Sequence, residues 1–264
     1  MTATTPITTA WDHDPDAGLD LAAEVYTRVG EPAPEALPED QPEPLATVVA
    51  RRDGVLLAWA SVFRDDESAA WIEPVTVERL AHHLNAGVYD DVPSSADEVA
   101  AFEAMFRHAA EEMRNEGFAV LRWSGEDACA AGAVAATLKA EAIAEVGRIW
   151  HADIAAYRRP EGLPEVEARP LPWGGVETEG ARIEIEPGDE RAYVNAAETI
   201  EGADAEVLAG LTAELVGYLG RVFPKITALS VFEFEEEDGP VRRALELAGL
   251  TIGARAWDYE LRLG

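Results

Sequence analysis

One pattern occurs twice in this sequence, at an interval of about 107 residues. In each copy a helix-spaced stretch ends at a small residue, and a strand with Arg and Trp at alternate positions follows. The matching residues are Leu138, Ala142, Arg148 and Trp150 in the first copy and Leu245, Gly249, Arg255 and Trp257 in the second. A single unit of this size leaves an apolar sheet face uncovered, so the repeat predicts two copies of one α/β unit. We place these units at residues 1–156 and 157–264, because prolines and glycines gather in the connecting residues 155–180.

The composition narrows the classes of ligand and compartment. The chain has 264 residues, 48% of them hydrophobic, which is enough for real cores. Its 51 acidic and 21 basic residues leave a formal net charge of -30, and such a field repels phosphate backbones and anionic lipids. We therefore expect no nucleic acid or membrane partner. The acidity favours a cationic substrate or a basic protein partner, with the base composition or salt habitat of the host as the alternative explanation.

The single cysteine and the N-terminus carry two further expectations. Cys129 alone forms no intramolecular disulfide and no multi-cysteine metal site. The first residues lack the basic and apolar regions of a secretion signal, and no later run is long enough to span a membrane. A cytoplasmic protein is predicted.

The hydrophobic spacing predicts similar elements in both copies. In the first copy, Asp53-Gly54 between two apolar runs indicates a hairpin, and Ser95 with Glu98 forms a capping box before the longest helix. The expected first-copy elements are a helix at 16–29, strands at 45–50, 55–63 and 71–77, an irregular segment at 78–93, a helix at 96–116, a strand at 118–123, a short helix ending near 142 and a strand at 145–154. The expected second-copy elements are strands at 182–186 and 192–194, a helix from 204 to 223, a strand at 226–234, a helix from 240 to 248 and a strand at 255–263.

This order of elements resembles the Gcn5-related N-acetyltransferase (GNAT) family, here in tandem. The resemblance rests on residues 45–63 and 99–154 of the first copy and 207–263 of the second, about two thirds of the chain. It implies an α/β fold of two GNAT-like units, each with a mixed, mostly antiparallel sheet flanked by helices. It also implies acetyl-CoA or another acyl-CoA as cofactor.

Two motifs of the family are missing from both copies. The family holds the pyrophosphate of acyl-CoA on a Gly-rich loop that opens the long helix. The corresponding residues 78–93 contain a single basic residue, Arg79, and residues 198–204 contain one glycine and three acids. The family also often uses a tyrosine, four residues before the small residue that ends the short helix, to protonate the departing thiolate. Leu138 and Leu245 stand there instead.

The resemblance and the residue types together nominate six site residues. Glu73 lies on the strand that borders the acceptor site in the family, so it is the first choice for a base. His151, which shares a strand face with Asp153, is a second base, and Tyr259 is a substitute proton donor by its nearness in the sequence. Val75 and Val77, at the end of the same strand as Glu73, and Arg79 after them would hold the cofactor.

Other clusters favour structural roles. His82, His83, Asp90 and Asp91 have the chemistry of a divalent-metal site, but adjacent histidines point apart, and we predict no metal. The acidic residues 233–238 are expected at a solvated surface. Glu126 and Asp127 should raise the pKa of the Cys129 thiol.

We therefore predict an N-acyltransferase that moves an acyl group from acyl-CoA to a small cationic amine. The missing motifs keep open a catalytically silent tandem protein that recognises a basic ligand or partner. A third possibility is the recruitment of the duplicated scaffold to a different reaction.

Overall fold

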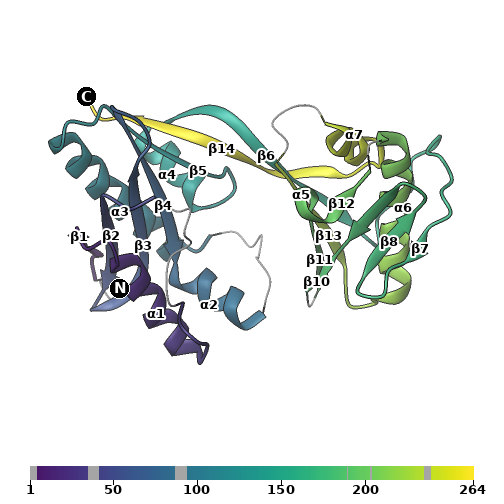
Figure 1. Cartoon of the computed structure of the whole chain (residues 1–264), viewed down its shortest axis with the longest axis horizontal. Coiled ribbons are helices and arrows are strands. Elements are labelled where there is room, and N and C mark those ends of the chain that lie inside the picture. The colour runs from purple at the N-terminus through teal and green to yellow at the C-terminus, as the bar shows by residue number, and fades with distance from the viewer. Residues whose placement is uncertain (1–4, 35–41, 87–93, 189, 203, 235–238) are drawn as a thin grey trace. The chain divides into compact units, whose positions relative to one another are not determined.

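The computed structural model of the chain describes residues 5–34, 42–86, 94–188, 190–202, 204–234 and 239–264 (Figure 1). It divides into two compact units. The first consists of Met1–Glu145 and Trp257–Gly264, and the second of Val146–Ala256. The division falls at 145/146 and at 256/257, within the last strand of each copy. The predicted boundary at 156/157 lies further along the chain. Each unit is described by itself below.

The first unit has a sheet with helices on both faces. Its elements are β1 (Thr8–Asp12), α1 (Ala17–Val29), β2 (Ala46–Arg52), β3 (Val55–Arg64), β4 (Ala69–Thr76), α2 (Val77–Ala86), α3 (Ala96–Asn115), β5 (Val120–Glu126) and α4 (Ala130–Leu138). The strands lie in the order β1-β2-β3-β4-β5, followed by the end of β14 (Thr251–Arg262). Neighbouring strands are antiparallel from β1 to β4, and β4 and β5 are parallel.

Local sequence explains the hairpin and the long helix. Asp53 and Gly54 both have positive φ, 52° and 79°, as the tight β2–β3 turn requires. At the start of α3 the Ser95 hydroxyl accepts a 3.2 Å hydrogen bond from the Glu98 amide, which confirms the predicted N-cap. Gly117 follows the helix with φ of 91°.

Two apolar clusters hold the helices to the sheet. The cluster beneath α3 and α4 contains Phe102, Phe106, Met113 and Trp123, all buried. The second cluster lies on the opposite face of the sheet, beneath α1 and α2. It contains Val25 of α1 and Leu56 and Trp59 of β3. The first unit is thus a three-layer α/β/α unit, and each face of its sheet has its own core.

The helix α2 differs from the expectation of an irregular segment at 78–93. Leu80, Ala81 and Leu84 pack on the α1-side cluster, so contacts with residues far away in the sequence stabilise a helix that its own polar composition did not indicate. Residues 87–93 of that predicted segment lie outside the described residues.

The second unit contains two sheets. Its elements are β6 (Glu141–Asp153), β7 (Arg169–Pro170), β8 (Gly175–Thr178), β9 (Ala181–Glu184), β10 (Glu186–Pro187), β11 (Arg191–Asn195), α5 (Ala196–Thr199), β12 (Ile200–Glu201), α6 (Ala205–Val222), β13 (Ala228–Glu233), α7 (Pro240–Leu247) and the first half of β14. One sheet has the order β14-β6-β13-β11-β10 and the other β12-β9-β8-β7. The expected linker at 155–180 therefore contains the strands β7 and β8.

The core of the second unit lies between α6, α7 and both sheets. Leu208, Leu211, Leu215 and Leu219 form the buried stripe of α6, at the helical spacing that the sequence predicts. Pro240 begins α7 and Gly249 follows it with φ of 77°, as expected.

The closing strands of the two copies are exchanged between the units. Residues 148–153 of β6, from the first copy, pair with β13, and Trp150 is buried in the core of the second unit. At the other end of the chain, the Leu263 amide donates a 2.8 Å hydrogen bond to the Ala119 carbonyl, and Trp257 packs on the core of the first unit. Each Arg-x-Trp strand thus completes the unit of the other copy. The exchange is the reason that the division does not coincide with the repeat boundary.

In the part of the chain that the structure describes, no helix is both long and apolar enough to cross a membrane.

Candidate amine pocket of the first unit

Three cross-strand pairs line up on one face of β3 and β4. Trp59 lies opposite Val75, Ser61 opposite Glu73, and Phe63 opposite Trp71. Because side chains alternate along a strand, these six residues share the face that α1 and α2 partly cover.

The larger of two pockets on this face has a volume of about 280 Å³. The apolar side chains of α1 and α2 form one wall, and the strand residues form the floor. The lining residues are Pro15, Gly18, Leu19, Ala22, Tyr26, Pro34, Pro44, Trp59, Ser61, Phe63, Glu73, Val75 and Leu80. Glu73 is the sole carboxylate among these described residues, and most of the others are apolar or aromatic.

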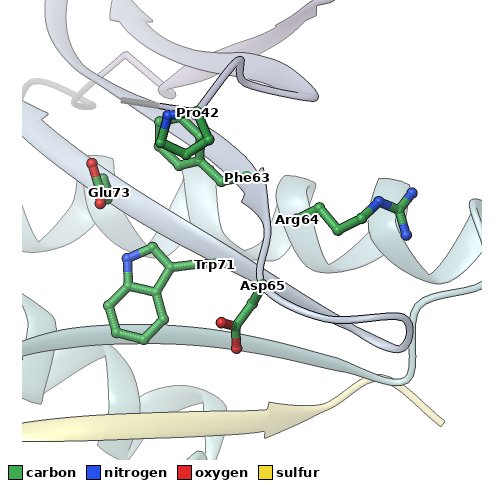
Figure 2. A pocket seen from close by; sticks show the side chains of 6 residues that line it. All are labelled: Pro42, Phe63, Arg64, Asp65, Trp71 and Glu73. Carbon is green, nitrogen blue, oxygen red and sulfur yellow. The ribbon is translucent and has the colours of Figure 1, made fainter. Parts of the chain in front are cut away.

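A smaller pocket of about 190 Å³ shares Phe63 and Glu73 with the larger one. Figure 2 shows Glu73 beside the indole ring of Trp71, while the Arg64 side chain runs away from both. The guanidinium of Arg64 lies over the Phe118 ring, 4.7 Å from its centroid. Asp65, also in the lining, accepts a 2.8 Å hydrogen bond from Arg122.

The Glu73 carboxylate is available to a ligand. Among the described residues, no hydrogen bond or ion pair engages its carboxylate. An anionic group beside aromatic rings and without a protein partner is suited to bind a cation. The prediction of Glu73 as the acceptor-site carboxylate stays a prediction, and its position in this pocket agrees with that role.

The strands β4 and β5 separate beside Glu73. They pair at only three positions, Ala69 with Val120, Ala70 with Leu121 and Trp71 with Arg122. Beyond these, β4 continues to Thr76 and β5 to Glu126, and these described residues form no further pairs with one another. Glu73 is two residues past the last pair, so its pocket lies at the point where the strands part.

An ion pair between Arg79 and Glu98 lies at the N-terminal end of α3. Arg79 donates a hydrogen bond of 2.6 Å from Nε to Oε1 of Glu98, and its Nη2 donates to Oε2 of Glu98 at 3.3 Å and to the Ser94 hydroxyl at 3.0 Å. The Ser94 hydroxyl also accepts a 2.8 Å hydrogen bond from the Ala130 amide. The basic side chain that the sequence offers to a pyrophosphate is thus bound by a carboxylate of the first turn of α3.

The other two predicted cofactor residues lie at the end of β4. Val75 lines the larger pocket, and Val77 is buried in the α1-side cluster as the first residue of α2. Among the described residues of the first unit, the unpaired strand backbone therefore fits the acyl end of an acyl-CoA, whereas the pairing of Arg79 with Glu98 does not fit its pyrophosphate end. Residues 87–93, which precede α3, lie outside the described residues.

The second unit has no counterpart of this arrangement among its described residues. Here β11 pairs with β13 at every one of its positions, from Arg191–Ala228 to Asn195–Phe232. The first amides of α6 are occupied as well, because the Asp204 carboxylate accepts from the Glu206 and Val207 amides at 2.9 and 3.1 Å. The described residues of the second unit therefore do not fit acyl-CoA.

The pairing register also identifies the residue that replaces Glu73. Ala228 follows Leu121 by 107 residues, and its partner Arg191 therefore corresponds to Ala70. Three positions further along, Val194 corresponds to Glu73, and it is buried in the core. The hairpin of β8 and β9 belongs to a separate sheet, and β10, which pairs with β11 beside Val194, is only two residues long.

The structure places His151 in the second unit, apart from the pocket lining. Its Nδ1 lies 3.0 Å from the Ser230 hydroxyl, which also accepts a 3.1 Å hydrogen bond from Arg191. The ring lies against Gly253, where any Cβ would clash with it. Ser230 is fully buried. These contacts hold the His151 ring against neighbouring strands. His151 belongs to the second unit, whereas Glu73 belongs to the first.

Tyr259 belongs to the first unit through the exchanged strand. Its ring lies 5.7 Å from that of Trp123 in the α3-side core, whereas Glu73 faces the α1 side. Burial raises the pKa of the phenol, and the nearby Asp127 adds to this effect. Tyr259 lines neither pocket.

The remaining clusters are structural. Glu233 is buried and binds Arg242 through two hydrogen bonds of 2.9 and 3.0 Å, which corrects the expectation of a solvated acidic surface at this residue. Residues 235–238 of that run lie outside the described residues. Burial, with help from Glu126, raises the pKa of Cys129 to about 12, in the predicted direction.

No metal site emerges in the described ranges, where no group of three His, Cys, Asp or Glu side chains could hold an ion. His82 and His83 lie on α2. Asp90 and Asp91 fall outside the described residues, so the predicted set as a whole is not described.

Sequence reasoning named Glu73 and missed the aromatic residues around it. The sequence predicts that Trp71 and Glu73 share a strand. The pairing of Trp71 with Phe63 depends on the turn at residues 65–68, which the sequence analysis does not predict. In that turn the Asp66 carboxylate accepts from the Ser68 and Ala69 amides at 2.7 and 2.8 Å. The Asp-x-Ser spacing was the available signal.

No family model matches the chain, and the search among curated proteins found no match. Among solved structures, a tandem GNAT protein from the clavulanic acid biosynthesis pathway, in its form without acetyl-CoA, matches at a TM-score of 0.50. It is 12% identical and the match covers 97% of this chain and 99% of that chain. A GCN5-related N-acetyltransferase from Sphaerobacter thermophilus, also 12% identical, matches over 98% of this chain and 97% of its own at a TM-score of 0.44. The full-length match to the first of these shows that the chain has the tandem GNAT fold, as its sequence pattern predicts.

Proposed function

We propose that the first unit binds a small cationic amine and that the chain transfers an acyl group to this amine from acyl-CoA. The observation that carries the proposal is the unpartnered Glu73 carboxylate, in an apolar pocket at the point where β4 and β5 part.

The charge of the pocket selects the ligand class. Glu73 is exposed at the pocket, and an ammonium group there gains a charge-assisted hydrogen bond to the carboxylate beside apolar and aromatic side chains. The net charge of -30 also raises the local concentration of cations and so favours their capture.

The chemistry requires a proton acceptor. A bound acyl-CoA supplies the acyl group in activated form, as a thioester. The amine nitrogen becomes a nucleophile only after it loses a proton, and Glu73 is positioned to orient the ammonium and to receive that proton directly or through a water molecule. Orientation beside the unpaired strand backbone contributes as well, because it converts a bimolecular encounter into a reaction within one complex. The proposal assigns no step to His151.

The test combines binding and turnover. Isothermal titration with acetyl-CoA at millimolar concentration should give a binding isotherm, and thiol release should require an added amine. Glu73→Gln keeps the shape of the side chain and should lower kcat/KM about 100-fold or more. Glu78→Gln is the matched control, because Glu78 is exposed on α2 and lines neither pocket. Absence of acetyl-CoA binding, or full activity of Glu73→Gln, would contradict the proposal.

A second candidate is a catalytically silent tandem protein that uses the same pocket to recognise a basic ligand or the basic side chain of a partner protein. The Arg79–Glu98 ion pair favours this silent candidate, because Glu98 already binds the basic side chain that would otherwise bind a pyrophosphate. This candidate predicts amine binding that depends on Glu73 without any binding of acetyl-CoA. The same two titrations, performed separately, distinguish the candidates.

A further inference from the structure

We infer that the ligand of this pocket carries one positive charge on an apolar body and has no carboxylate, so that simple amines bind and the corresponding amino acids do not. The inference rests on the amine site of the proposed function. It does not depend on acyl transfer.

The first step concerns the single positive charge. Glu73 faces both pockets, and Trp71 and Phe63 stand beside it as the next cross-strand pair. An ammonium at this point can bind the carboxylate and lie against an aromatic face at the same time (Figure 2). The head group of the ligand therefore belongs at Glu73.

The second step concerns the apolar body. Apart from Glu73, the described residues that line the larger pocket include no charged side chain. Leu19, Ala22 and Leu80 face Trp59 and Val75 across it. A second ammonium placed here would lose its hydration without gaining a partner, so diamines should bind more weakly than monoamines with an apolar body.

The third step excludes a carboxylate on the ligand. Arg64 is the sole cationic residue in the described lining of either pocket, and its guanidinium stacks on Phe118. Arg122, which contacts the lining residue Asp65, already binds three carboxylates, those of Asp65, Asp66 and Glu260. The carboxylate of an amino acid would therefore meet Glu73 without a compensating positive charge.

The experiment measures binding alone, in the full chain and without acyl-CoA. Isothermal titrations compare 2-phenylethylamine, L-phenylalanine and 1,4-diaminobutane, which differ in the carboxylate and in the apolar body. We expect 2-phenylethylamine to bind at least tenfold more tightly than either of the others. Glu73→Gln should weaken its binding at least tenfold, and Trp71→Leu should weaken it several-fold and more than Trp71→Phe does, whereas the control Glu78→Gln should bind like the parent protein.

The alternative outcomes are distinct. Equal affinity for L-phenylalanine would overturn the inference, and loss of that affinity in Arg64→Gln would identify Arg64 as the group that accepts the carboxylate. Tighter binding of 1,4-diaminobutane, or binding of none of the three ligands, would also overturn it. Selective binding of 2-phenylethylamine by a protein that does not bind acetyl-CoA would leave this inference standing and would refute acyl transfer.

Discussion

Arg79 and Glu98 form a part-buried ion pair at the first turn of α3, with 2.6 Å between Nε and Oε1. An anion-binding helix N-terminus normally leaves its amides and any nearby cation to the ligand. Here an internal carboxylate takes that cation. We therefore expect the pair to weaken the binding of phosphate groups to the first unit.

Release of Arg79 should strengthen the binding of coenzyme A. Glu98→Gln removes the carboxylate that competes with a phosphate for the Arg79 guanidinium, so we expect the dissociation constant for coenzyme A to fall about tenfold. The measurement is isothermal titration of both proteins at one salt concentration.

Asp97→Asn is the matched control for that change. It removes one negative charge from the same helical turn, but its partner is Arg52, so Arg79 stays paired. An equal gain in both variants would show that net charge alone, and not the release of Arg79, changes the affinity.

Loss of the Glu233 carboxylate should destabilise the second unit. Glu233→Gln removes the buried negative charge that binds Arg242 and replaces one of the two oxygens that serve Arg242 and the Trp150 indole, which lies 3.4 Å away. We expect a loss of about 3–5 kcal/mol in the free energy of unfolding, measured by urea denaturation. Glu201→Gln breaks the exposed pair with Arg182 and should cost less than about 1 kcal/mol. Similar losses in the two variants would contradict a special cost of burial.

The Cys129 thiol should react slowly. With its pKa raised to about 12 from 9.0, the folded protein holds about a thousandfold less thiolate near pH 8 than an ordinary cysteine does. Iodoacetamide should therefore label the folded protein far more slowly than the urea-unfolded chain. Glu126→Gln should speed the labelling, because Glu126 opposes the thiolate. Fast labelling of the folded protein would contradict the burial of this thiol.

The same group makes stability depend on pH. A thiol whose pKa is higher in the folded state stabilises that state fully below its unfolded pKa, and this contribution declines as the pH rises from about 9 toward 12. Cys129→Ser removes this titration. The difference in unfolding free energy between the two proteins should accordingly be constant below pH 8 and should change above pH 9.

Tyr259→Phe should leave acyl transfer unchanged within about twofold, because the ring is packed beside Trp123 and lines neither pocket. In the described residues no hydrogen bond engages its hydroxyl, so the unfolding free energy should change by less than about 0.5 kcal/mol. Tyr157→Phe, which removes a 2.7 Å hydrogen bond to the Ala248 carbonyl, should cost about 1 kcal/mol. A tenfold drop in kcat for Tyr259→Phe would instead support the predicted proton donor.

Local signals predicted most helices and the first hairpin. Ser95 and Asp204 cap the two long helices, and Asp53-Gly54 makes the tight turn, because each acts through hydrogen bonds or dihedral angles within a few residues. The helix α2 escaped prediction, since its apolar residues contact α1 and β3 rather than one another. Glu233 was misassigned for a similar reason, because its partner Arg242 comes from the following helix.

The candidate site was predictable in part. Glu73 followed from its strand and from the family resemblance. The position of Trp71 and Phe63 beside Glu73 depends on the register of β3 and β4, and the contact of Arg79 with Glu98 joins residues 19 positions apart, so local sequence predicts neither. The role of Arg79 in cofactor binding stays a prediction.

The sequence by itself determined that the chain contains two copies of one α/β unit, because recurrent spacing and caps act locally in each copy. Only the tertiary structure decided where each closing strand pairs. A strand hydrogen-bonds to whichever edge lies beside it, and this choice sends Trp150 into the second unit and Trp257 to the first. The same long-range pairing leaves β4 and β5 apart at Glu73 and joins β11 to β13 along the full length of β11, so the two copies of one pattern differ at the strands that carry Glu73 and Val194.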